Sequence, residues 1–465
     1  MNFTGKRILF IGYRGKESHL RTARGEGMLL DLIIDAGEMR EEYRGAFDTV
    51  HVLDDIFDWR QIAAAVEGTN YDAVLTRFED FTFLVSAVAD FLGLRSVALA
   101  DAPKFRNKYL MRKAFAEHGV PSADFQLVRS SDDARPMVEK HGFPLMVKQI
   151  AGIHSKYVAR VEDEQGLRST IEYYLDCLSR ETGTLHGQLH HFPKTIAGPD
   201  YRTHLLVEEC ISGEELTVDA FVVDGKPFLT PICKYIMPEE MGFHDHHLPI
   251  RIMPYNLSEE EQGIVDSAVK KSLKALGADF CVTHVEVFFN RATKDCRLIE
   301  VASRSGGFRA EMVYHTCGGD YDFGLVRAAL GLKPDVASIP QRFAAVAEVF
   351  SPENGILEAV ESSFLEEQEH LYSLTQNKQV GDMVGRASDG HSFVLKFLVT
   401  ADSYEEVVRR AKDLLLKVRS SIRVRNGTSP PCLPLEALAK WGGRACLPDR
   451  QGLRGEGSVC YNRHT

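Results

Sequence analysis

The stretch that decides the fold runs from Phe280 to Arg304 and reads FCVTHVEVFFNRATKDCRLIEVASR. Polar and apolar residues alternate on both sides of the polar segment 290–295, which predicts two antiparallel strands over 280–289 and 296–303. Successive side chains of a strand point to opposite faces. We therefore expect one face of this hairpin to carry His284, Glu286 and Phe288 from the first strand and Leu298, Glu300, Ala302 and Arg304 from the second.

Folding the hairpin about residues 292–293 sets two carboxylates, Glu286 and Glu300, almost opposite each other. Directly opposed like charges destabilise a sheet. A bound Mg²⁺ prefers hard oxygen ligands and would remove this repulsion, and in proteins such an ion usually bridges the phosphates of a nucleotide. The alternative is a solvated sheet face on which Arg304 balances the two glutamates.

The first hundred residues alternate strand-like segments (7–12, 49–53 and 71–76) with helix-like segments (62–66 and 83–92). Such alternation predicts a small open parallel sheet. No Gly-x-Gly-x-x-Gly follows the first strand, and no Gly-x-x-x-x-Gly-Lys-Ser/Thr occurs anywhere. The sequence therefore predicts neither a dinucleotide fingerprint nor an ordinary P-loop.

Later segments carry further strand and helix signals. Ser258 with Glu261, and Ser403 with Glu406, have the spacing of capping boxes and predict the start of two amphipathic helices. The strands expected outside the hairpin in this part of the chain are 143–148, 157–161, 205–209, 216–223 and 393–400.

Composition limits the classes of function. The chain has 465 residues, 44% of them apolar, which is typical of a globular protein with about three domains. A net charge of −11 argues against a nucleic-acid partner held by phosphate neutralisation. The best apolar stretch, 81–94, is interrupted by Asp90, so we expect no membrane span and a cytoplasmic location. The nine cysteines show no CxxC spacing and predict no disulfide framework.

Five motifs occur in a fixed order along about 200 residues. They are Asn107-Lys108-Tyr-Leu-Met-Arg112, Gly142-Phe-Pro-Leu-Met-Val-Lys148, Val207-Glu208-Glu209-Cys-Ile-Ser-Gly213-Glu-Glu215, His284-Val-Glu286 and Ile299-Glu300-Val-Ala-Ser-Arg304-Ser-Gly-Gly307. This order resembles the ATP-grasp superfamily, and most of all its carboxylate–amine ligases, which join L-amino acids. The resemblance covers about residues 1–420.

The resemblance implies a multidomain α/β and α+β fold. Its parts are a small parallel α/β (pre-ATP-grasp) domain over 1–105, an ATP-grasp domain over 106–335 with a lid subdomain at about 120–205, and a small C-terminal α+β domain over 336–425. Residues 426–465 match nothing in this pattern, lack any helical or strand period, and are expected to form a poorly ordered tail.

The resemblance also implies roles for individual residues. The implied ATP-binding residues are Lys108, Lys148, Ser155, Glu208, Glu209, Ile211 and Glu215. Lys108 and Lys148 would hold phosphate oxygens, Glu208 the adenine amino group together with the backbone of the residues after it, and Glu215 the ribose hydroxyls. The implied ligands of one or two Mg²⁺ ions, or of Mn²⁺, are Glu286 and Glu300. Arg304 would stabilise the transferring phosphoryl group and the tetrahedral oxyanion.

The reaction implied is ATP-dependent ligation. ATP phosphorylates a carboxylate, and an amine attacks the acyl phosphate to give an amide, ADP and phosphate. The partners would then be small carboxylate and amine substrates, amino acids by the resemblance, with a homodimer left open.

Three departures from the family pattern keep alternatives open. The lid loop 151–157 has one glycine, Gly152, where the family is glycine-rich. The position two after the second metal carboxylate is Ala302, where the family usually has Asn. The run His244-Asp245-His246-His247 looks like a transition-metal cluster, but adjacent side chains point to opposite faces of a strand, which favours a substrate-lining loop. The alternatives are a carboxylating relative such as biotin carboxylase and a nucleotide-binding protein that has lost catalysis.

Overall fold

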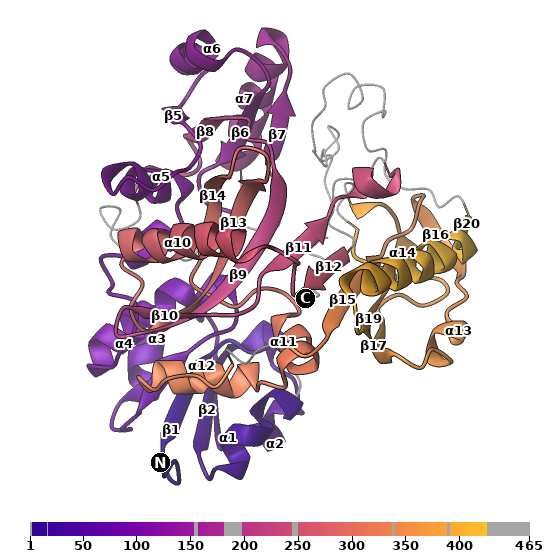
Figure 1. Ribbon diagram of the computed structural model, residues 1–465. Coiled ribbons are helices and arrows are strands. Elements are labelled where there is room, and N and C mark those ends of the chain that lie inside the picture. Colours follow the sequence, from indigo (N-terminus) through magenta and orange to yellow (C-terminus); the bar gives the residue numbers. More distant parts are fainter. Residues whose placement is uncertain are drawn as a thin grey trace, which may run out of the picture.

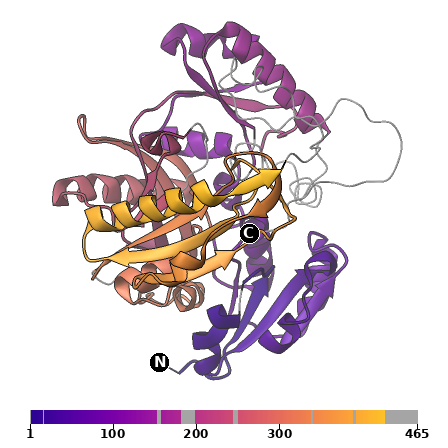
Figure 2. The ribbon, with the colours of Figure 1, turned by 90° about the vertical axis from the view of Figure 1, so that its right-hand side faces the viewer.

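The structure, a computed structural model, describes residues 2–15, 17–152, 157–180, 198–243, 250–336, 340–387 and 391–425. Figure 1 shows the N-terminal part (indigo) at the bottom, the lid region (purple) at the top and the C-terminal part (orange and yellow) on the right of a long central sheet. In the view turned by 90° (Figure 2), the N-terminal and lid parts again lie at opposite ends of the molecule. The central sheet therefore separates two smaller α/β layers.

The N-terminal part is a four-stranded parallel sheet with the strand order β3-β2-β1-β4. Its strands are β1 (Arg7–Ile11), β2 (Leu29–Asp35), β3 (Thr49–Leu53) and β4 (Ala73–Leu75), and its helices are α1 (Arg21–Gly25), α2 (Tyr43–Ala46), α3 (Trp59–Val66) and α4 (Thr82–Leu92). The parallel sheet was predicted, but β2 is an additional strand that the sequence analysis missed. The Leu29–Asp35 segment carries a buried aspartate, Asp31, which Arg7 and Tyr71 satisfy from the neighbouring strand and a loop.

The lid region is a four-stranded antiparallel sheet with the order β5-β8-β6-β7. Its strands are β5 (Phe125–Val128), β6 (Leu145–Gln149), β7 (Val158–Val161) and β8 (Leu205–Glu209), with helices α6 (Arg135–His141) and α7 (Glu164–Ser179). The apolar stripe of α7, including Leu167, Ile171 and Tyr174, packs into one core with the buried residues of these strands. Helix α5 (Lys108–Glu117) connects the N-terminal part to this region.

The central sheet has nine strands, with eight in the order β14-β13-β9-β11-β12-β15-β19-β17 and β10 paired to β9. These strands are β9 (Glu214–Val223), β10 (Lys226–Leu229), β11 (Cys233–Ile236), β12 (Ile250–Met253), β13 (Cys281–Asn290), β14 (Asp295–Ala302), β15 (Phe343–Val349), β17 (Leu371–Gln376) and β19 (Leu395–Ala401). Strands β12 and β15 pair antiparallel, so one sheet runs through the boundary expected at residue 335. Three short strands, β16 (Gly355–Ala359), β18 (Met383–Val384) and β20 (Arg423–Arg425), form a separate small sheet.

Helices cover the central sheet and join it to its neighbours. They are α10 (Glu259–Leu276), α11 (Arg309–Cys317), α12 (Tyr321–Ala329), α13 (Ser363–Glu366) and α14 (Tyr404–Ser421). The capping box predicted at Ser258 and Glu261 begins α10, and Ser403 accepts from the Glu406 N–H at the start of α14. Val326 and Ala329 of α12 lie in the core of the N-terminal part, so this helix fixes that part against the central sheet.

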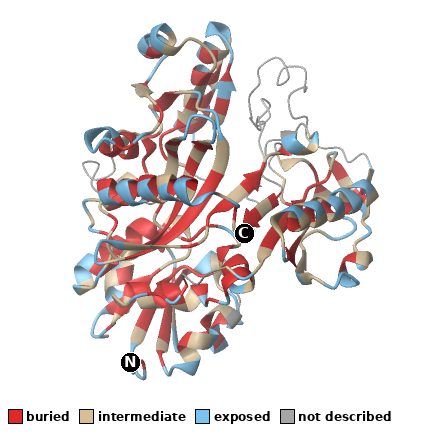
Figure 3. Cartoon of the chain, in the orientation of Figure 1, coloured by how far each residue is buried: buried red, intermediate tan, exposed pale blue. Residues whose placement is uncertain are grey.

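Burial follows these layers. In Figure 3 the strands of the central sheet are largely buried, whereas α10 and α14 expose one face. A search of the described helices finds none that is both long and apolar enough to cross a bilayer.

Candidate functional site

The predicted site residues lie on one face of β9, β13 and β14, where polar side chains line up in rows. Thr217 is paired with Glu286, and Glu286 with Glu300, which confirms the opposition of the two carboxylates that the sequence predicts. Two positions further along, Asp219 is paired with His284. Because side chains of one row and of alternate rows share a face, the three strands present a polar patch within an otherwise apolar sheet.

One expectation about this hairpin is wrong, because Leu298 does not share the face of Glu300. The register shifts at a β-bulge between Glu286 and Val287, so that Val287 is paired with Leu298 and both are fully buried. The bulge leaves Ile299 as the extra residue of β14. An extra residue reverses the alternation beyond it, and the sequence pattern alone does not reveal where this happens.

Lys108 lies directly beside one of the predicted metal carboxylates. It is the first residue of α5, whose N-cap Asn107 accepts from two backbone N–H groups of the first turn. The Lys108 Nζ is 2.7 Å from Glu300 Oε1, and the Lys108 side chain is 11% exposed. The ammonium group of Lys108 thus forms an ion pair with Glu300. The predicted alternative, in which Arg304 balances both glutamates, does not describe this pairing.

Glu286 stays ionised in this setting. Burial alone would raise the pKa of Glu286. The His284 imidazole, whose Nε2 lies 3.4 Å from Glu286 Oε1, lowers this pKa, and so do Arg304 and Lys108. Together these groups outweigh burial, so the pKa lies below its ordinary value. The Glu286 and Glu300 side chains are each 26% exposed. Both carboxylates therefore remain accessible to a ligand.

Two cations enclose the carboxylate of Glu208. Arg112 Nε lies 2.7 Å from Oε1 and Lys148 Nζ 2.6 Å from Oε2, and Glu208 is 1% exposed. Burial would raise its pKa, but Arg112 and Lys148 lower it to about 2. The residue assigned to the adenine and one assigned to the phosphates thus contact each other. A carboxylate has about four acceptor positions, so Glu208 retains capacity for a further donor.

Arg304 lies beyond the end of β14 and contacts the N-terminal part. Its Nη2 and Nε donate to one oxygen of Glu79, at 2.9 and 3.1 Å. Arg106 Nη1 lies 2.7 Å from the other oxygen. Burial would raise the pKa of Glu79, but Arg304, Arg106 and Lys108 lower it to about 2. A carboxylate from another layer therefore orients the residue assigned to catalysis.

The remaining predicted ATP residues are placed as follows. Glu209 accepts from Arg297 Nη1 at 2.7 Å and from the Asp124 N–H at 2.9 Å, so its side chain joins the lid region to the hairpin. Ile211 follows β8 and is half-buried. Glu215 is paired with Phe288 and lies two residues before Thr217 in β9, so it is on the same face. Ser155 and the run 244–247 lie outside the described residues.

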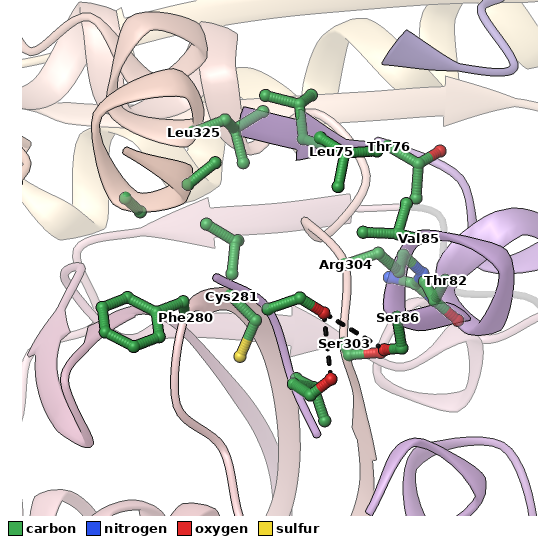
Figure 4. A pocket seen from close by; sticks show the side chains of 16 residues that line it. Leu75, Thr76, Thr82, Val85, Ser86, Phe280, Cys281, Ser303, Arg304 and Leu325 are labelled. Atoms are coloured by element: carbon green, nitrogen blue, oxygen red, sulfur yellow. Dashed lines mark hydrogen bonds between the residues drawn. The ribbon is translucent and has the colours of Figure 1, made fainter. Parts of the chain in front are cut away.

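A small cavity of about 50 Å³ lies beside Arg304 (Figure 4). Its walls come from the end of β4, from α4, from α12 and from the start of β13, including Thr76, Thr82, Cys281 and Leu325. Ser96 Oγ donates to the Val97 carbonyl at 2.9 Å within this wall. The cavity therefore lies where the N-terminal part meets the central sheet, next to the site.

The donor set offers a hard divalent cation two protein carboxylates. Within the described ranges no group of three or more His, Cys, Asp or Glu side chains is arranged around a common point. Glu286 and Glu300 offer two neighbouring carboxylates, and one of them already attracts an ammonium group. Mg²⁺ usually takes one or two protein carboxylates and completes its shell with water and phosphate oxygens, so this pair suffices for it.

Sequence reasoning assigned no role to three charged residues that hold the site together. Arg112 follows Lys108 by four residues, so both lie on one face of α5, and that spacing was a usable signal. Asp219 interrupts the apolar strand Glu214–Val223, which is also a signal. Glu79 lies in a short 3₁₀ turn, Glu79–Phe81, and nothing local points to its partner Arg304, 225 residues away.

Comparison with known proteins agrees with this arrangement. Residues 141–311 match the family described as the ATP-grasp domain. An alanine–anticapsin ligase of Bacillus subtilis (strain 168) is 26% identical over 260 residues, which are 53% of this chain and 51% of that protein. The chain thus spans about half the length of the curated relatives it matches.

Solved structures share the fold over about nine-tenths of the chain. An L-amino acid ligase from Bacillus licheniformis superposes with a TM-score of 0.75 at 18% identity, covering 91% of this chain and 99% of that one. A biotin carboxylase–β-γ-ATP complex from Campylobacter jejuni gives 0.64 at 15% identity, covering 91% and 92%. At these identities the likeness establishes the fold and not the reaction. Residues 141–311 thus match an ATP-grasp domain, and the predicted resemblance of the chain to ATP-grasp carboxylate–amine ligases is confirmed.

Proposed function

We propose that the protein is an ATP-dependent carboxylate–amine ligase that joins small substrates, amino acids among them, through an acyl phosphate. The observation that carries the proposal is the pairing of Glu286 with Glu300 beside Lys108. Such a set of two carboxylates and a lysine suits phosphoryl transfer, which depends on positioning and charge stabilisation. A bound Mg²⁺ would supply charge neutralisation for the phosphates there.

The chain's own residues would divide the work. Lys108 and Lys148 offer positive charge to phosphate oxygens, and Glu208 with the backbone after it receives the adenine. Glu215, on the same sheet face, is the proposed partner of the ribose hydroxyls. Arg304, a planar donor fixed by Glu79, would stabilise the charge that develops on the transferring phosphoryl group. Pre-set donors of this kind need little rearrangement during the reaction.

A carboxylating enzyme is the second candidate, because the biotin carboxylase complex shares the fold over 91% of the chain. Both classes activate a carboxylate or bicarbonate with ATP, so they differ in the acceptor and not in the phosphate site. The third candidate is a nucleotide-binding protein that has lost catalysis. It is suggested by Ala302, which stands where the family usually has Asn.

ADP release measured with defined additions separates the three. ADP formation that needs a mixture of amino acids, with a condensed product in the mass spectrum, supports ligation. Dependence on bicarbonate supports carboxylation. ATP binding without turnover supports the third. A mock preparation from cells that do not express the protein is the control in each assay, since any ADP release in it comes from another enzyme.

A further inference from the structure

A buried carboxylate, that of Asp219, lies between the metal-binding row and the Arg304 segment. Asp219 is fully buried in β9. Its Oδ1 accepts from His284 Nδ1 at 2.6 Å. Its Oδ2 accepts from the Gly306 N–H at 2.8 Å and from the Tyr321 hydroxyl. An ionised carboxylate only accepts hydrogen bonds, so His284 Nδ1 carries the proton in this contact.

His284, whose ring is held by Asp219, also contacts Glu286. With Nδ1 fixed on Asp219, the opposite ring nitrogen, Nε2, lies 3.4 Å from Glu286 Oε1. The Tyr235 hydroxyl lies 3.5 Å from the same nitrogen. The imidazole therefore cannot turn without losing contacts at both ends.

The second oxygen of Asp219 restrains the other half of the site. Gly306 lies two residues after Arg304, and a Cβ atom at position 306 would come within 2.5 Å of His284 Nδ1. Only a glycine allows the backbone to pass this close to the imidazole. One carboxylate thus holds both the imidazole behind Glu286 and the turn that follows Arg304.

We propose that Asp219 is a positioning residue that sets the relative placement of the Glu286 carboxylate and the Arg304 segment through His284 and the Gly306 N–H. This inference rests on the proposed metal site at Glu286 and Glu300, and is independent of which substrates are joined. Residues that orient metal ligands from behind commonly change metal affinity about 10- to 100-fold when altered.

The experiment measures Mn²⁺ binding by electron paramagnetic resonance titration of the full chain with a non-hydrolysable ATP analogue, alongside ADP release. His284→Asn keeps an amide N–H near Asp219 but has no atom where Nε2 faces Glu286. Asp219→Asn replaces one carboxylate oxygen by an NH₂ group, which cannot accept from the donors that meet at Asp219. We expect each variant to bind Mn²⁺ about 10- to 100-fold more weakly.

Tyr321→Phe is the matched control, because it removes a donor to the same carboxylate from α12 and contacts neither Glu286 nor Arg304. It should bind Mn²⁺ as the wild type does, even if its melting temperature falls. Wild-type affinity in His284→Asn would overturn the positioning role alone, whether or not Asp219→Asn folds. An equal loss of affinity in Tyr321→Phe would assign Asp219 a general role in stability. Wild-type protein that binds no Mn²⁺ with the analogue would overturn the metal site itself.

Discussion

Arg112→Met tests how much the enclosed ion pair at Glu208 stabilises strand β8. Glu208 is 1% exposed, and its pKa is lowered from 4.5 to about 2 by Arg112 and Lys148 acting against burial. That lowering corresponds to about 3 kcal/mol at neutral pH. Removing one of the two cations leaves Lys148, so we expect a loss of about 2–3 kcal/mol in the local stability of β8.

Hydrogen–deuterium exchange of the peptide that contains β8 measures this loss within a multidomain chain. Exchange in Arg112→Met should be about 30- to 150-fold faster than in the wild type at pH 7. Lys113→Met removes the same charge from the exposed side of the same helix and should leave β8 unchanged. A peptide from β2 serves as the internal reference.

The pH dependence has a definite sign. Because the pKa of Glu208 is lowered in the folded protein, its contribution is present above about pH 4.5 and is lost as the pH falls toward 2. Wild-type β8 should lose protection over this range, and Arg112→Met should lose less, since its Glu208 pKa lies nearer 4.5. Equal exchange of β8 in Arg112→Met and Lys113→Met at pH 7 would refute the reasoning.

Three further changes probe the proposed phosphate and metal end of the site. Glu300→Gln should abolish ADP release while ATP binding persists, and near-normal turnover at ordinary Mg²⁺ would show that the metal assignment is wrong. Arg304→Lys should lower turnover at least about 10²-fold, because a point charge cannot replace the planar group that meets Glu79 through two nitrogens; unchanged kcat would reduce Arg304 to charge balance. Ala302→Asn should lower the free Mg²⁺ needed for half-maximal turnover several-fold, and superimposable titration curves for variant and wild type would argue against a second ion at that position.

Local patterns were enough to predict the hairpin over residues 280–304, its facing carboxylates and the start of α10. Alternation along residues 280–304 predicted the hairpin and the opposition of Glu286 and Glu300, because strand periodicity is a property of the backbone itself. The capping signal at Ser258 worked for the same reason, since its partners are three residues away.

Contacts between distant segments were beyond the reach of these patterns. The bulge at Ile299 depends on how β14 fits both β13 and the neighbouring helix α5, whose Arg112 donates to the Ile299 carbonyl at 2.8 Å. The pairing of Arg304 with Glu79 needs the N-terminal part to be docked first. Tertiary packing determines such partners, and the periodicity of a single sequence does not reveal them.

The continuity of the central sheet limits where this protein can be divided. Cutting the chain near residue 335 would strip β15 from β12 and leave the backbone groups of Ile250–Met253 as a bare edge. It would also remove Glu348 from Arg251, leaving a guanidinium with 12% exposure and no counter-charge from β15. Open edges of this kind template association between molecules. A chimera that takes its C-terminal segment from a relative should therefore keep β12 and β15 from the same parent. A fragment that stops at residue 335 is expected to aggregate.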